Sequence, residues 1–272
     1  MLKFAHIINP VIVGVDSDLF IAQPITFETM RLAKEYSSQV CDVELFATTF
    51  PEDSDIVPLY FSKTVNLERS ILDIGVFKIK RKLPLLKDIL DRLYESSDAD
   101  YFIYTNVDIA LQPFFYSLVV NFIENKFDGF IINRRTIDKG LNTIESLPIM
   151  LSQSGEIHPG LDCFIFKRDI YPRFILKNGS IGAIFIGKIL AWNLAIFSDN
   201  FYVFKDLHAT FHIGKDRIWQ SVELEDYKTH NQLQAIEVLK DLEKVQKGSI
   251  DLLKKLDLIK PTNIFIEFLK NN

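Results

Sequence analysis

Apolar and polar residues alternate along most of the chain in blocks that predict strands and helices by turns. Strands are expected where short runs are almost wholly apolar: Lys3–Asn9, Val40–Thr48, Tyr101–Thr105, Gly129–Asn133 and Leu161–Phe166. Helices are expected where apolar residues recur every three or four positions, over residues 24–38, 84–96, 113–124 and 180–198. Strands that alternate with helices are typical of an α/β fold with a mostly parallel sheet covered by helices on both faces.

Two stretches depart from this alternation. From Thr136 to Pro159 the apolar pattern weakens and glycines and prolines interrupt it, so we predict a loop-rich insertion that covers a site. After Trp219 the apolar residues fall on one face of an amphipathic helix, which Gly248 and Ser249 end, and two short helices are expected to follow. We therefore predict one domain over residues 1–220 and a C-terminal helical extension over residues 221–272 that packs on it.

The composition argues against nucleic acid and membrane-spanning classes. The 272 residues are 48% hydrophobic, and a formal charge of -5 lacks the excess of Lys and Arg that nucleic-acid binding needs. The longest apolar segment, Ile181 to Phe197, is shorter than the roughly 20 residues that span a bilayer, so no transmembrane segment is predicted. Cys41 and Cys163 lie in apolar runs as reduced core thiols, and the first residues do not resemble a secretory signal. We expect a cytoplasmic protein, with association to the inner face of the membrane as a further option.

The strongest candidate for chemistry is Asn106-Val107-Asp108, which follows the apolar run Tyr101–Thr105. In an open α/β sheet, ligands bind beyond the carboxyl ends of the strands, where this tripeptide lies. Asn106 and Asp108 can point to the same side, and two oxygen ligands suit a hard divalent cation that also holds substrate phosphates. The other interpretation is an Asx-type turn that ends the strand, and the tripeptide alone favours it.

The longer stretch YFIYTNVDIAL, residues 101–111, resembles the metal-binding strand of GT-A fold glycosyltransferases, which use nucleotide-diphosphate sugars. The Asp-x-Asp motif of that family binds the divalent ion, and Asn106 replaces its first Asp here, which leaves Asp108 as the better ligand. Further segments follow in a similar order: AHIINPV at the first strand end, ELFATTFPED at the second, and a basic pair before the helix that leads into the metal strand. The resemblance extends from Lys3 to Trp219 and implies a single Rossmann-like GT-A domain.

The resemblance also implies a donor site. Asn9, Pro10 and the turn that contains Thr49 would border the nucleotide together with Asn106, and the basic pair would face its diphosphate. That pair is Arg81 and Lys82. A positive pair at a helix start is well suited to phosphate oxygens, although the charge pattern of KIKRK alone favours a solvated run.

A histidine downstream of the sheet often completes the metal shell in this family. The resemblance therefore assigns His212, or failing that His208, as a ligand beside Asp108 and Asn106. The expected cofactor is Mn²⁺ or Mg²⁺, and a mixed set of imidazole and carboxylate suits Mn²⁺. A single histidine is otherwise more often a hydrogen-bonded structural side chain.

Asp162 and Asp216 are the candidates for the catalytic base. Asp162 precedes a strand, where its carboxylate could take the proton of an acceptor hydroxyl or could instead cap the turn. Many inverting members of the family carry a Glu-Asp pair on the following helix, whereas IGAIFIGKILAWNL, residues 181–194, contains no carboxylate. Inversion and retention of the sugar's configuration therefore both stay open.

The sequence thus predicts a metal-dependent glycosyltransferase that moves a sugar from a nucleotide-diphosphate sugar to an acceptor hydroxyl. The acceptor would be a glycan, a lipid-linked sugar or a small molecule, in the synthesis of surface polysaccharide or glycoconjugates. Two alternatives stay open: a sugar-phosphate nucleotidyltransferase, and a noncatalytic GT-A-like binding or scaffold domain. The sequence contains no serine-nucleophile elbow, no P-loop and no G-x-G-x-x-G, which argues against esterases, P-loop ATPases and dehydrogenases.

Overall fold

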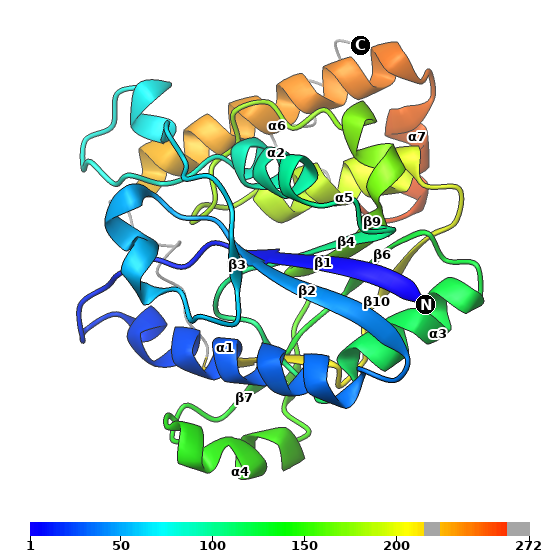
Figure 1. Ribbon diagram of the computed structural model, residues 1–272. Coiled ribbons are helices and arrows are strands. Elements are labelled where there is room, and N and C mark those ends of the chain that lie inside the picture. The colour runs from blue at the N-terminus through cyan, green and yellow to red at the C-terminus, as the bar shows by residue number, and fades with distance from the viewer. Residues whose placement is uncertain (215–223, 260–272) are drawn as a thin grey trace. The chain divides into compact units, whose positions relative to one another are not determined.

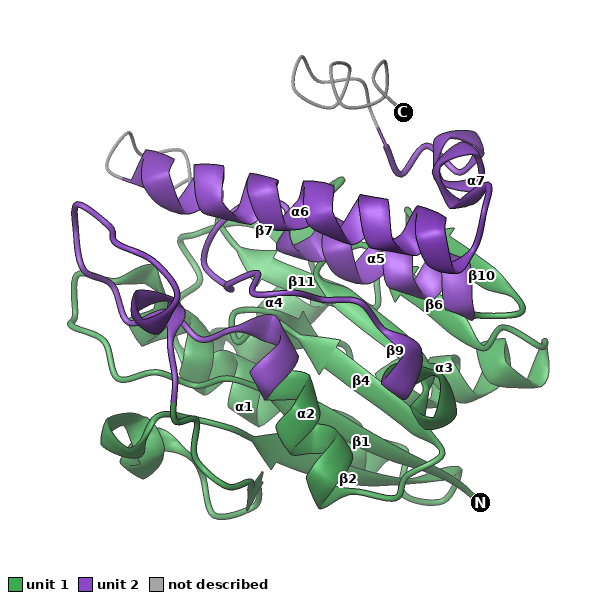
Figure 2. Ribbon diagram, turned by 90° about the horizontal axis from the view of Figure 1, so that it is seen from above, with its two compact units in different colours: residues 1–68, 89–171, 198–217 green, residues 69–88, 172–197, 218–272 purple. Residues whose placement is uncertain are grey.

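The computed structural model describes residues 1–214 and 224–259, and internal contacts divide them into two units, coloured separately in Figure 2. Among these residues, unit 1 contains residues 1–68, 89–171 and 198–214, and unit 2 contains residues 69–88, 172–197 and 224–259. Each unit is therefore assembled from segments that are far apart in the sequence.

Unit 1 is built around a seven-stranded sheet in which one strand alone runs against its neighbours. In order across the sheet, the strands are β10 (Phe201–Phe204), β6 (Gly129–Ile132), β9 (Cys163–Lys167), β4 (Tyr101–Thr105), β1 (Leu2–Ile8), β2 (Cys41–Ala47) and β3 (Ser62–Lys63). Strand β9 is antiparallel to both β4 and β6, and the other pairs are parallel. All five residues of β4 are buried, as expected for a strand covered on both faces. The predicted α/β class with a mostly parallel sheet is confirmed.

Helices cover the sheet of unit 1. Helices α1 (Asp18–Tyr36) and α3 (Phe115–Glu124) lie on the same face (Figure 1). Their apolar sides share one core with the strands, and this core includes Phe4, Phe27, Met30, Ile103, Phe115 and Val119. On the opposite face, Tyr94 of α2 (Leu86–Ser96) meets Phe102 of β4 edge to face, with ring centroids 6.3 Å apart.

A second, smaller sheet of unit 1 occupies part of the region that the sequence predicts as a loop-rich insertion. Its four strands, in order, are β5 (Ala110–Leu111), β11 (Thr210–Ile213), β7 (Arg135–Ile137) and β8 (Glu156–Ile157). Helix α4 (Leu147–Ser152) lies between β7 and β8 along the chain. Residues 136–159 therefore contain more regular structure than the weak apolar pattern indicated, because strands of two or three residues are too short to show a period.

Unit 2 brings the C-terminal helices together with two earlier segments of the chain. Its helices are α5 (Ile186–Phe197), α6 (Glu225–Val245) and α7 (Ser249–Lys255), together with the first residues of α2. The ring of Tyr227 in α6 stacks on Phe77 with centroids 4.2 Å apart. Nε1 of Trp192 in α5 donates a hydrogen bond to the carbonyl oxygen of Leu258 at 3.1 Å. The predicted division of the chain at residue 220 stays a prediction about functional domains.

Several boundaries differ from the sequence expectations. Helix α1 begins at Asp18 rather than near Pro24, because Ser17 accepts a hydrogen bond from the amide of Leu19 at 3.3 Å and caps the helix there. Helix α5 begins at Ile186, and the preceding residue Phe185 has a left-handed backbone with φ of 76°. Four short 3-10 helices complete the described elements: Pro51–Ile56, Ile71–Asp73, Ile144–Ser146 and Arg168–Arg173.

Two expectations about the compartment can be compared with the structure. Both cysteines are free thiols in buried positions of β2 and β9, as predicted. Within residues 1–214 and 224–259, no helix combines the length and the apolar character that a membrane crossing requires. The second of the short helices predicted after Gly248 would fall beyond residue 259 and lies outside the described residues.

Candidate functional site

The end of β4 carries the carboxylate that the sequence analysis singled out. The chain turns after Thr105, and the amide of Ile109 donates to the carbonyl oxygen of Asn106 at 3.1 Å before β5 begins. Strand β5 pairs antiparallel with β11 in a register that joins Ala110 to Phe211. The next residues along this register are Ile109 and His212, so the pairing of the small sheet brings the imidazole beside Asp108.

Asp108 and His212 form a close pair. Nε2 of His212 lies 3.2 Å from Oδ2 of Asp108, and the two side chains are 4% and 25% exposed. Nδ1 of His212 lies 2.9 Å from the carbonyl oxygen of Gly214, which can only accept, so Nδ1 carries a proton. In neutral His212 the lone pair of Nε2 therefore faces the carboxylate. Only a proton or a cation between the two atoms makes that contact favourable.

The electrostatics of the pair follow from burial and from mutual attraction. Burial opposes the ionisation of Asp108, but the hydrogen bond and charge of His212, together with Arg134, hold the pKa of Asp108 below its usual value. Burial likewise opposes protonation of His212, but Asp108 outweighs it and raises the pKa of the imidazole. The pair is thus arranged to keep one positive charge, from a proton or a metal, next to the carboxylate.

The register of β9 brings a second acid to the same edge of the large sheet. Thr105 of β4 pairs with Cys163, and Ile131 of β6 pairs with Phe164. One position further along the first register, Asp162 lies opposite Asn106. Two positions further along the second register, Asp162 lies beside the residues that follow β6. Nδ2 of Asn106 donates to Oδ1 of Asp162 at 3.4 Å.

Arg134 follows β6 and pairs with Asp162. Its Nη1 lies 3.2 Å from Oδ2 of Asp162, and the two side chains are 12% and 13% exposed. Burial raises the pKa of Asp162, although Arg134 partly offsets that rise. Arg134 was not predicted from the sequence. The signal that could have found it is the one that selected Asp108, namely a polar residue just beyond a buried apolar strand.

We call Asn106, Asp108, Arg134, Asp162 and His212 the strand-end site. Within the part of the chain that the structure describes, Oδ1 of Asp108 and Nε of Arg134 are buried without a hydrogen-bond partner. Oδ2 of Asp162 is buried too, and it contacts Arg134 as an ion pair without the geometry of a hydrogen bond. Such atoms are uncommon in protein interiors, because an unsatisfied polar group costs about 1–3 kcal/mol. Their concentration at one edge of the sheet indicates a place where a polar ligand binds.

The donor set of this site is suited to a divalent cation. A carboxylate oxygen and an imidazole nitrogen are both ligands of Mn²⁺, and neighbouring octahedral ligands at about 2.1 Å from an ion lie about 3 Å apart. The 3.2 Å between Asp108 and His212 is close to this separation. Over residues 1–214 and 224–259, however, no cluster of three or more His, Cys, Asp or Glu side chains is arranged to hold a metal. A metal here would take two protein ligands, with water or substrate phosphates as the others.

The other residues proposed for the metal and the base are Asn106, which belongs to the strand-end site, His208 and Asp216. The side chain of Asn106 accepts from the hydroxyl of Tyr104 at 3.1 Å and contacts Asp162. Nε2 of His208 accepts a hydrogen bond from the side-chain Nε2 of Gln112 at 2.9 Å. Asp216 lies outside the described residues.

The residues proposed for the nucleotide fall in both units. Asn9 and Thr49 are buried just after β1 and β2, where Nδ2 of Asn9 donates to the carbonyl oxygen of Thr48 at 2.6 Å. Pro10 follows in the same loop, so these three residues lie at the carboxyl edge of the parallel strands. Arg81 and Lys82 belong to unit 2, where the amide of Arg81 donates to the hydroxyl of Tyr227 at 2.8 Å. Their predicted role stays a prediction.

Comparisons with known proteins show the fold. No protein-family model matches the chain, and no curated protein matches it either. S. aureus TarS residues 1–349, solved in complex with UDP-GlcNAc, is similar with a TM-score of 0.51 and 8% identity, over 91% of this chain and 74% of that one. Full-length S. aureus TarS is similar with a TM-score of 0.53 and 9% identity, over 94% of this chain and 43% of that one.

A third similar structure is glucosyl-3-phosphoglycerate synthase from Mycobacterium tuberculosis in complex with Mn²⁺, UDP-glucose and phosphoglyceric acid. Its TM-score is 0.50 at 12% identity, over 87% of this chain and 79% of that one. The chain therefore has the fold of GT-A glycosyltransferase structures, with a mostly parallel seven-stranded sheet flanked by helices.

Proposed function

We propose that this protein is a glycosyltransferase that uses a divalent metal to transfer a sugar from a nucleotide-diphosphate sugar to an acceptor hydroxyl. The observation that carries the proposal is the Asp108–His212 pair, 3.2 Å apart beyond the central strand of a GT-A fold. The similar structures were solved with UDP-GlcNAc in one case and with Mn²⁺ and UDP-glucose in another.

Asp108 and His212 would hold the ion, with Mn²⁺ preferred over Mg²⁺ because one ligand is an imidazole. The bound ion would neutralise the charge that develops on the leaving diphosphate. Asn9, Pro10 and Thr49 would border the nucleotide at the neighbouring strand ends. Fixing the diphosphate beside Asp108 positions the donor, which is the main task of a site where charge must be stabilised in the transition state.

Asp162 would act as the base. In the transfer step the acceptor oxygen bonds to the anomeric carbon, the bond from that carbon to the diphosphate oxygen breaks, and Asp162 takes the proton of the acceptor hydroxyl. Burial raises the pKa of Asp162, which makes it a stronger base than a surface carboxylate. Arg134 and Asn106 contact its two oxygens and would fix its orientation.

An assay with a panel of nucleotide sugars and Mn²⁺ tests the proposal. Transfer or hydrolysis releases a nucleoside diphosphate, a nucleotidyltransferase working on a sugar phosphate and a nucleoside triphosphate releases pyrophosphate, and a scaffold releases neither. We expect nucleoside diphosphate, and we expect Asp108→Ala to abolish its release. Asp42→Asn, which changes an exposed carboxylate of β2, is the matched control and should leave the rate unchanged.

A further inference from the structure

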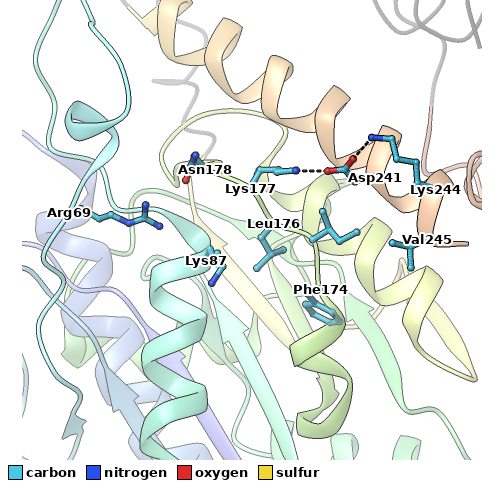
Figure 3. A pocket seen from close by; sticks show the side chains of 10 residues that line it. Arg69, Lys87, Phe174, Leu176, Lys177, Asn178, Asp241, Lys244 and Val245 are labelled. Carbon is cyan, nitrogen blue, oxygen red and sulfur yellow. Dashed lines mark hydrogen bonds and ion pairs between the residues drawn. The ribbon is translucent and has the colours of Figure 1, made fainter.

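Unit 2 contains a cavity of about 590 Å³ that the proposed sugar transfer does not use (Figure 3). It is lined by the start of α2, by residues 174–178 and by the last turns of α6. This volume falls within the range of about 300–1,000 Å³ that is usual for small-molecule sites. The apolar part of the lining includes Leu176, which is buried, and Phe174, which is partly buried.

Basic side chains dominate the polar lining of this cavity. Arg69, Lys87, Lys177 and Lys244 line it together with one carboxylate, Asp241. Asp241 accepts from both Lys177 and Lys244, the latter at 2.9 Å, so two ammonium groups share one acid (Figure 3). Asp88, outside the lining, pairs with Arg69 through two contacts of 2.8 Å. Lys177 and Lys244 therefore carry two positive charges against the single negative charge of the carboxylate that they share.

The backbone at Lys177 is held in an unfavourable conformation. Its φ is 53°, in the left-handed region that residues with a Cβ rarely adopt. The next residue fixes this turn to α6, because the amide of Asn178 donates to Oε1 of Gln234 at 3.0 Å and its carbonyl oxygen accepts from His230 at 2.9 Å. Strained backbone of this kind persists where the surrounding structure over-determines it, often at a ligand site. Here the turn aims a lysine at the cavity.

We propose that this cavity, which we call the lysine cavity, binds the phosphate group of a phosphate ester through Lys177 and Lys244. Lysine ammonium groups bind phosphate as point charges, and a phosphate can take the hydrogen bonds that both lysines now give to Asp241. The apolar residues beside them suit the body of the ester. A soluble sugar or glycerol phosphate and the headgroup of an anionic lipid offer the same chemistry.

The test uses the full chain without nucleotide, with glycerol 3-phosphate as the soluble probe and with vesicles of phosphatidylcholine with or without phosphatidylglycerol. Calorimetry measures the binding of glycerol 3-phosphate, and co-sedimentation measures the binding of the vesicles. We expect the wild type to bind at least one of these anionic probes. The double variant Lys177→Gln, Lys244→Gln should weaken that binding by at least about tenfold, because both side chains keep their length and lose their charge.

Lys240→Gln is the matched control. Lys240 pairs with Glu237 on α6 three residues away, as Lys244 pairs with Asp241, but it does not line the cavity. Lys177→Gly relieves the left-handed backbone and removes the charge, so it should lose binding while its melting temperature is unchanged or higher. Selective binding of glycerol 3-phosphate assigns the cavity to a soluble ester, and selective binding of phosphatidylglycerol vesicles assigns it to a headgroup.

Two results would contradict phosphate binding in the lysine cavity. One is a wild type that binds neither anionic probe, and the other is an equal loss of binding in Lys240→Gln and in the double variant. Asp108→Ala should bind the same probe normally. Phosphate binding in the lysine cavity is therefore tested independently of the proposed sugar transfer.

Discussion

The strand-end site of unit 1 and the lysine cavity of unit 2 both gather charged side chains, but they do so in different ways. In the strand-end site the charged groups form two pairs of opposite sign, Asp108–His212 and Arg134–Asp162, and both pairs are largely buried. In unit 2 two lysines share Asp241 and the side chains are more exposed, up to 74% for Lys244. Burial makes the first site sensitive to every single charge, whereas solvent screens the second.

This difference follows from how the two regions are built. The strand-end site rests on three strand registers, because Asp108, Asp162 and Arg134 each lie within two residues of a paired strand. The lysine cavity rests on long side chains from a helix and from a turn, and such side chains keep more freedom. We therefore expect substitutions at the strand-end site to have large effects on chemistry and stability, and substitutions at the lysine cavity to affect mainly ligand binding.

The largest expected effect is on the transfer step itself. Asp162→Asn removes the proposed base, so the rate of sugar transfer should fall by about 10²–10⁴-fold. Binding of the donor with Mn²⁺ should stay within about twofold, because Asp162 acts on the acceptor. Calorimetry measures donor binding, and release of the nucleoside diphosphate measures the rate of transfer. Full activity in Asp162→Asn would move the base to another residue.

The next largest effect compares two arginine–aspartate pairs directly. Arg134→Gln leaves Asp162 buried without a charge partner and should lower the free energy of unfolding by about 3 kcal/mol. Arg69→Gln breaks a pair whose arginine side chain is 46% exposed and should cost less than about 1 kcal/mol. Urea unfolding of both variants measures the difference. An equal loss of unfolding free energy in the two variants would show that burial does not make the Arg134–Asp162 pair more important for stability than the Arg69–Asp88 pair.

A smaller effect concerns pH. The pKa of Asp108 is lowered from 3.8 in the folded state, so its contribution to stability is present above pH 3.8 and is lost as the pH falls through the folded pKa. The pKa of His212 is raised from 6.5, so its contribution is present below pH 6.5 and is lost as the pH rises through the folded pKa. Between these limits both side chains are mostly charged.

Asp108→Asn should therefore destabilise the metal-free protein by about 1 kcal/mol near pH 5–6, and by less above the raised pKa of His212. Thermal unfolding in the presence of a chelator, followed from pH 5 to 9, measures this dependence. His6 offers an internal reference, because burial lowers its pKa to about 3 and it stays neutral over this range. A loss that is the same at every pH would mean that the two side chains do not form a charged pair.

The sequence predicted the layered α/β fold because buried parallel strands are apolar along their whole length, and this pattern is visible without tertiary contacts. It did not predict that β9 runs antiparallel, since an apolar run such as Cys163–Lys167 has no direction of its own. That reversal carries Asp162 to the same edge as Asn106. Strand β5 has two residues, too few for any period, yet its pairing brings His212 to Asp108.

Unit 2 could not be predicted from the sequence for a related reason. It is assembled from three separate stretches, and the hydrogen bonds that join them, such as that from Trp192 to Leu258, link positions 66 residues apart. Composition changes along the chain locate linkers, but they do not show which distant segments pack together. The basic lining of the lysine cavity is dispersed over residues 69–244 and forms no charge run.

The measurement that tests the central claim most directly is a titration of the protein with Mn²⁺ followed by electron paramagnetic resonance, in which the signal of the free ion disappears on binding. In the presence of a nucleoside diphosphate, and relative to the same titration without protein, we expect the wild-type protein to bind one further ion per chain and Asp108→Asn to bind none. Equal binding of Mn²⁺ by the two proteins would contradict a metal site at Asp108 and His212.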